Sequence, residues 1–182
     1  VELIHNRAVS GNLEGVLQGS YRVDEVQDGD ASEAVGVGLG VTGTLLSKVT
    51  GSLAIDLQRR KGVSSDPGAN DDRILFSAEL VWSVDDTTSL FAEARTVNYT
   101  EGNGVDVIRD EYRMIFLKDM LESYRFAFAL GRSEVDYRIL SLSRRDINHR
   151  AELRIERAFG LNGVTYAGFI FERNKSGVEF YD

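Results

Sequence analysis

The stretch from Asp72 to Tyr99 alternates apolar and polar residues, and this constrains the fold more than any other feature of the chain. Apolar residues recur at every second position from Arg73 to Val84, and the alternation resumes from Ser89 to Tyr99 after a turn sequence at Asp85 to Thr88. A period of two is typical of a β-strand with one apolar face, whereas an amphipathic helix repeats every three to four residues. The stretch therefore predicts two long antiparallel strands joined by a tight turn.

The same alternation recurs along the chain, so the sequence predicts nine strands. They are Asn12 to Asp24, Ala34 to Leu46, Ser52 to Arg60, Arg73 to Val84, Ser89 to Tyr99, Glu111 to Lys118, Ser123 to Ser133, Asp146 to Phe159 and Val164 to Arg173. Before them, Val1 to Ile4 fits the tail of an earlier strand, with a turn at His5 to Arg7. Asn162-Gly163 is the strongest hairpin signal, because a type I′ turn needs two residues of positive φ.

Glycines occupy every second place in the middle of the segment from Ala34 to Leu46, at Gly36, Gly38 and Gly40. A glycine-rich loop that cradles phosphate lies between a strand and a helix, and these glycines lie inside a strand, so that function is not supported. We expect them to leave space on the curved side of the sheet, where another side chain comes close.

The predicted connections alternate between long and short. The long ones, Glu25 to Glu33, Lys61 to Asp71, Thr100 to Arg109 and Asp136 to Arg145, have roughly nine to eleven residues each and resemble the external loops of a membrane barrel. A Greek-key sandwich has no reason to keep this order. The sequence therefore predicts an all-β, antiparallel, up-and-down transmembrane β-barrel. We expect one domain over residues 1–182 that is part of a larger barrel. Aromatic residues near the strand ends are candidates for interfacial girdles: Trp82, Tyr99, Tyr112, Tyr124, Phe159 and Tyr166.

Composition excludes several other classes. The net charge of −8 disfavours non-specific binding to nucleic acid. The absence of cysteine excludes a disulfide framework and thiolate metal sites. No apolar run reaches the length of a transmembrane helix, about 18 residues. The sequence opens at Val1 without an initiator methionine or signal peptide, so we expect a processed chain or a piece of a longer one.

Charged residues on the polar parity of the strands are the candidate functional residues. In a membrane barrel this face lines a wet lumen, where charges either set selectivity or pair across strands and fill space. The lumen-facing candidates are Glu14, Arg22, Asp56, Arg60, Glu79, Glu93, Arg95, Glu111, Arg113, Arg125, Arg150, Glu152, Arg154 and Glu156. If Val84 faces Leu90 across the turn, Glu79 lies opposite Arg95, a favourable pair that we expect to fix the register.

The sequence predicts no catalytic residue, metal or cofactor. A hydrolase of the outer membrane would need a nucleophile or a water-activating group, and His5 and His149 are the two histidines of the chain. His149 shares parity with apolar neighbours, so we expect it at the edge of a bilayer. A calcium site at Asp28, Asp30 and Glu33 lacks the spacing of a known calcium loop.

The strand series and two sequences near the C-terminus, at Arg157 to Gly163 and Phe171 to Gly177, resemble the outer-membrane β-barrel porins associated with exopolysaccharide gene clusters. The resemblance covers most of the chain and implies a passive pore or the outer-membrane component of polysaccharide export. It implies a location in the bacterial outer membrane, with membrane lipid, polysaccharide and export-system proteins as partners. In such proteins another strand follows the segment resembling Ser176 to Asp182, so we expect a C-terminal truncation. The alternative is a non-pore structural or interaction protein whose long loops bind a partner.

Overall fold

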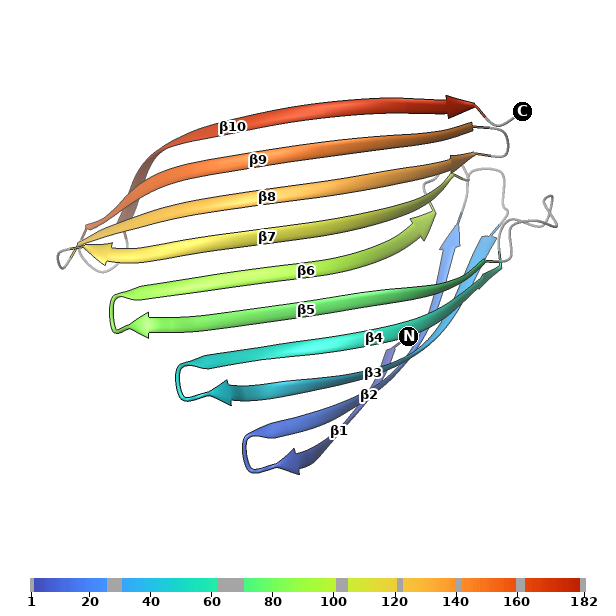
Figure 1. Cartoon of the computed structure of the whole chain (residues 1–182), viewed down its shortest axis with the longest axis horizontal. Helices are drawn as coiled ribbons and strands as arrows, with labels where there is room; N and C mark the ends of the chain where they lie inside the picture. Colours follow the sequence, from blue (N-terminus) through green and yellow to red (C-terminus); the bar gives the residue numbers. More distant parts are fainter. Residues whose placement is uncertain are drawn as a thin grey trace.

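The computed structural model describes residues 2–25, 31–61, 71–100, 105–120, 123–139, 142–159 and 163–180. They form one antiparallel sheet in which the order of strands in space is their order in the chain (Figure 1). The ten strands are β1 (Glu2–Ser10), β2 (Leu13–Glu25), β3 (Ala31–Leu46), β4 (Val49–Lys61), β5 (Asp71–Asp85), β6 (Thr88–Thr100), β7 (Asp106–Met120), β8 (Tyr124–Ile139), β9 (Leu142–Phe159) and β10 (Gly163–Phe180).

The predicted up-and-down, antiparallel, all-β fold is confirmed, but the sheet is not closed into a barrel. Within the described residues, β1 pairs only with β2 and β10 pairs only with β9. Both edges of the sheet therefore carry unpaired backbone groups. Among the residues described, no helix is long and apolar enough to cross a membrane.

All nine predicted strands are present, and a tenth precedes them. Residues His5 to Arg7 lie inside β1 and pair with β2, so the predicted turn there is wrong. The predicted loop from Asp136 to Arg145 is also wrong, because Asp136 pairs directly with Arg145 where β8 and β9 continue. Along β8 the apolar residues change face, from Leu130 on the outer face to Val135 and Tyr137 on the inner face, so the earlier alternation breaks although the backbone ladder persists. Ser176 likewise lies within β10, beyond the predicted end of that strand at Arg173, because the ladder continues there.

The last hairpin forms where it was predicted, but with a different register. A two-residue turn centred on Asn162-Gly163 would leave Gly163 outside the ladder. Instead, Gly163 pairs with Phe159. Val164 therefore pairs with Ala158, three residues before Leu161, which an Asn-Gly turn would place opposite it.

The two faces of the sheet differ in chemistry and in exposure. Leu53, Ile55 and Leu57 on β4 are exposed, whereas Asp56 and Gln58, which point to the other side, are half-buried. In a single curved sheet the more covered side is the concave one. We call the side with Asp56 the inner face and the side with Leu53 the outer face, and the strand register extends both across all ten strands.

Burial is inverted relative to a water-soluble domain. The surface area is 12581 Å², whereas a compact monomer of this mass exposes about 8,800 Å². Among the described residues, only Ala34, Val107, Ala127 and Val135 are buried apolar residues. On the outer face, Leu39 is 68% exposed. The sheet therefore has no extensive apolar core of its own, and most of its large exposed apolar side chains lie on the outer face.

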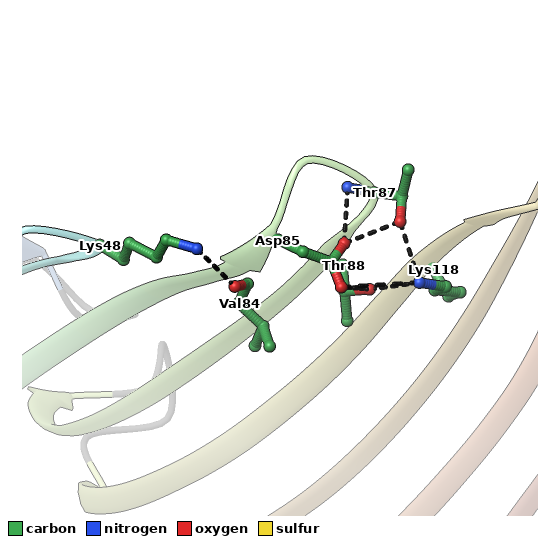
Figure 2. A network of polar contacts seen from close by, with 6 residues as sticks. All are labelled: Lys48, Val84, Asp85, Thr87, Thr88 and Lys118. Atoms are coloured by element: carbon green, nitrogen blue, oxygen red, sulfur yellow. Dashed lines mark hydrogen bonds and ion pairs between the residues drawn. The ribbon is translucent and has the colours of Figure 1, made fainter.

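The turn between β5 and β6 is fixed by a network around Asp85 (Figure 2). The carboxylate accepts hydrogen bonds from the Thr87 amide at 2.8 Å, the Thr87 hydroxyl at 2.7 Å and the Thr88 hydroxyl at 2.9 Å. Lys118 on β7 donates to both hydroxyl groups, and Lys48 donates to the carbonyl of Val84 at 2.9 Å. These hydrogen bonds hold the pKa of Asp85 well below its usual range.

This turn gives a register different from the predicted one. Asp85 pairs with Thr88, and the shift between Ser83 and Asp85 leaves an extra residue, Val84, in β5. As a result Glu79 lies opposite Glu93, and the predicted pairing of Glu79 with Arg95 is wrong. A local turn with several hydrogen bonds outweighs one exposed ion pair, which contributes about 1 kcal/mol or less.

The glycines of β3 make room on the inner face, as the sequence analysis expected. A Cβ on Gly38 would lie 1.6 Å from the Asp56 carboxylate, so the Asp56 side chain occupies the space above this residue. A Cβ on Gly40 would lie 2.8 Å from the backbone oxygen of Leu53. Near the β1–β2 turn, Gly43 has a φ of 141°, a conformation that favours glycine.

Candidate functional site

The candidate site is the charged inner face. All fourteen lumen-facing candidates lie on this face, because the register keeps their parity from strand to strand. A row that crosses β5, β6 and β7, for example, contains Glu79, Glu93 and Arg113. Of the aromatic candidates, Trp82, Tyr112 and Tyr124 lie on the outer face and Tyr99 and Tyr166 on the inner face, while the side chain of Phe159 lies outside the described part of the structure.

Ion pairs link the charged residues of β6 and β7. The guanidinium of Arg95 contacts the Glu111 carboxylate at 2.5 Å and the Glu93 carboxylate at 3.7 Å. Arg109 approaches Glu111 at 3.6 Å. Arg95 and Glu111 lie directly opposite each other on adjacent strands, so the contact follows from the register.

A second set of ion pairs runs along β9. Arg150 contacts Glu172 on β10 at 2.8 Å and Glu152 at 3.2 Å. Arg154 contacts Glu156 at 2.9 Å and Glu152 at 3.8 Å. Each of these arginine side chains is well exposed to solvent. The alternating charges of β9 therefore neutralise one another without a dry core.

A hollow of about 440 Å³ lies between these two sets of ion pairs. It opens above Gly131, where a Cβ would meet no atom closer than 3.8 Å. Six of the predicted candidates line it, together with Glu172: Glu93, Arg95, Glu111, Arg113, Arg150 and Glu152. Guanidinium and carboxylate groups so arranged can contact hydrated ions and polar solutes from both sides.

The remaining candidates do not join the hollow. Glu14, Arg22, Asp56 and Arg60 lie on β2 and β4, and Arg125 pairs with Asp119 at 2.7 Å near the β7–β8 turn. Glu79 lies on β5, in the same row as Glu93 but outside the lining of the hollow. Arg154 and Glu156 lie on β9 towards the β9–β10 turn.

Arg60 is 1% exposed and therefore does not line open space. It donates to the side chain of Asn98, which is 4% exposed, at 3.1 Å. Arg73 donates to the same amide oxygen at 3.1 Å, and the Asn98 amide nitrogen donates to Gln58. This polar cluster lies beyond the paired residues Ser77 and Arg95, where β5 and β6 diverge (Figure 1).

Sequence reasoning missed two residues of the hollow and its border. Glu172 pairs with Arg150, and the signal for it is its place one residue after the outward-facing Phe171. Arg109 was assigned to a loop, although β7 begins at Asp106. The alternation of Arg109, Glu111 and Arg113 would have extended the strand to include it.

In the part of the chain that the structure describes, no group of three or more His, Asp or Glu side chains is arranged to hold a metal ion. The calcium ligands considered at Asp28 and Asp30 lie outside the described residues. His149 lies on the outer face, opposite Arg132 and Arg173. Comparison of the chain with models of protein families, with curated proteins and with solved structures finds no match.

Proposed function

We propose that this sheet is the wall of an outer-membrane β-barrel that acts as a porin-like channel. The observation that carries the proposal is the inverted burial, with apolar side chains on the exposed outer face and ion-paired side chains on the covered inner face. Lipid would cover the outer face, and water would fill the space inside the inner face.

The apolar band of the outer face supports this proposal, because it runs obliquely across the sheet. It includes Leu53 to Leu57 on β4 and Phe126 to Leu130 on β8. The register row that starts at Leu53, however, reaches β8 at Arg132, just beyond the band. The band therefore shifts by roughly six residues over four strands, which corresponds to a strand tilt of about 45°.

That tilt matches the geometry of membrane barrels. A flat membrane cuts tilted strands at a different residue on each strand, so the apolar band of a barrel must drift along the register. Barrel strands tilt by about 35 to 45°, and the apolar band is about 25 Å tall. A sheet packed on a protein core has no such requirement.

Closure of the wall is part of the proposal. Unpaired backbone groups cost several kcal/mol each in lipid, so the free edges of β1 and β10 would have to pair. They would pair with each other or with further strands. The role in polysaccharide export that the sequence resemblance implies stays a prediction.

Conductance in planar bilayers tests the channel directly. The protein, refolded in detergent and added to a bilayer, is expected to produce discrete conductance steps. Replacement of Glu111 by Gln is expected to shift the reversal potential in a salt gradient towards anion selectivity, because it removes a negative charge from the hollow. Leu57→Gln on the outer face serves as the control for selectivity.

Two results would contradict the proposal. One is a protein that stays monomeric in water without detergent and gives no conductance. The other is a conductance whose ion selectivity is insensitive to the charges of the hollow. In the first case deletions within residues 62–70 would test the alternative, a scaffold whose long loops bind a partner.

A further inference from the structure

A cluster of basic residues lies on the outer face, directly beyond the apolar band. Arg132 on β8 lies opposite His149 on β9, and His149 lies opposite Arg173 on β10. All three side chains are exposed. Lys175, the next outward-facing residue of β10, is exposed as well. We call these four residues the basic rim.

An apolar groove of about 550 Å³ begins next to the basic rim. Met114, Leu130, Ala151 and Phe171 form its floor, which is one register row of the apolar band. Tyr112 borders it on β7, and the groove reaches Arg132 and His149 of the basic rim. The basic rim forms the neighbouring register row and flanks the groove along one side. An apolar groove flanked by cations fits an amphiphile that has an anionic head and an acyl chain.

The basic rim has more basic than acidic side chains, whereas a basic residue elsewhere on the outer face is neutralised by a neighbouring carboxylate. Among the described residues, no carboxylate pairs with Arg173, His149 or Lys175. Arg132 contacts Glu134, which also contacts Arg145. On the opposite half of the sheet, Arg59 occupies an equivalent position just beyond the apolar band, and it is paired with Asp72 at 2.8 Å.

We propose that the basic rim and the apolar groove form a site for a membrane lipid with a phosphate headgroup. The phosphate lies between the basic side chains, where arginine can donate two parallel hydrogen bonds to it. One acyl chain lies along the groove over Leu130 and Phe171. This inference rests on the proposed function, because it requires the outer face to meet lipid.

Lipid retention, measured by native mass spectrometry on the detergent-purified chain, tests the site. The probes are phosphatidylglycerol and phosphatidylcholine with identical acyl chains, which differ in net headgroup charge. The chain is expected to retain phosphatidylglycerol in preference. Arg173→Gln and Lys175→Gln are each expected to lower this preference by about fivefold.

Arg59→Gln is the matched control, because it removes an outer-face arginine that is already neutralised, and it is expected to leave the preference unchanged. Arg173→Lys is expected to keep most of it. Inorganic phosphate at the same concentration is expected not to displace the lipid, because it cannot fill the groove.

Three results would overturn the inference: equal retention of both lipids, an unchanged preference in Arg173→Gln and Lys175→Gln, or displacement by inorganic phosphate alone. The failure of the proposed function looks different. In that case the chain would retain neither lipid and would not insert into vesicles.

Discussion

The half of the sheet formed by β1 to β5 and the half formed by β6 to β10 present the same outer face but different inner faces. In the first half, small residues such as Gly36, Gly38 and Gly40 line the inner face, and a side chain from the next strand lies over Gly38. In the second half, arginine and glutamate pair across the strands around Gly131. The outer face is thus constrained alike in both halves, as one surrounding medium would require, while the inner face is free to vary.

The halves also differ in how far their strands continue past the apolar band. On β8 and β9 the ladder continues through Asp136 and Arg145, with Val135 buried on the inner face. On β4 the strand ends at Lys61, soon after the apolar residue Leu57. The described part of β8 therefore continues further past the apolar band than that of β4.

The largest expected effect tests what the two halves share. Leu39→Arg in β3 and Phe128→Arg in β8 are each expected to lower the free energy of unfolding in lipid vesicles by about 2 to 4 kcal/mol near the bilayer midplane. Ser77→Arg, which is exposed on the inner face, is expected to cost much less. Denaturant titration in vesicles measures all three. A large loss in one half only would show that the halves do not face the same medium.

The second prediction separates the halves at their glycines. Gly40→Ala is expected to destabilise the protein by about 1 to 3 kcal/mol, because the added methyl group would press on the backbone of Leu53. Gly131→Ala is expected to cost little, because its surroundings are open. Gly19→Ala is a further control, since no atom lies within 4 Å of the added Cβ. Equal losses in Gly40→Ala and Gly131→Ala would remove the distinction between the two inner faces.

The third prediction tests the turn that joins the halves. The pKa of Asp85 is lower in the folded protein than its usual value of 3.8, so the carboxylate stabilises the fold above that pH. This stability is lost as the pH falls through the folded pKa. Asp85→Asn is therefore expected to flatten the pH dependence of unfolding below about pH 4, measured by chemical denaturation in acid. Asp86→Asn, in the same turn, is the control, and an identical flattening there would contradict the role of Asp85.

The smallest expected effect tests the register between the halves. Glu79 faces Glu93, so Glu79→Arg is expected to stabilise the protein by about 0.2 to 1 kcal/mol, by replacing a like pair with an opposite one. The double variant Glu79→Arg with Arg95→Glu is expected to bring no such gain. It replaces Arg95, which pairs with Glu111, by a second acidic residue. A coupling energy between positions 79 and 95 in a double-mutant cycle would contradict the observed register and support the one that the sequence predicted.

The sequence predicted strands wherever one face is apolar and the other polar. It failed at Asp136 to Arg145, because the apolar residues of β8 change there from the outer to the inner face while the backbone ladder continues. It failed again at the β5–β6 register, because the extra residue Val84 results from hydrogen bonds to Asp85, which alternation does not report. This error did not change the side of the sheet on which each residue lies, because the register differs by an even number of residues. All fourteen charged candidates lie on the inner face. Which of these residues meet in the hollow depends on the register between neighbouring strands. The alternation within one strand gives no information about that register.

Cysteine labelling along β9 tests the central claim most directly, because the chain contains no cysteine of its own. Single cysteines are placed at each position from Ala151 to Glu156, and the protein in vesicles is treated with a membrane-impermeant maleimide. We expect labelling at 152, 154 and 156, on the inner face, and protection at 151, 153 and 155, on the outer face. Uniform labelling, or labelling of the outer-face positions alone, would contradict a wall with lipid outside and water inside.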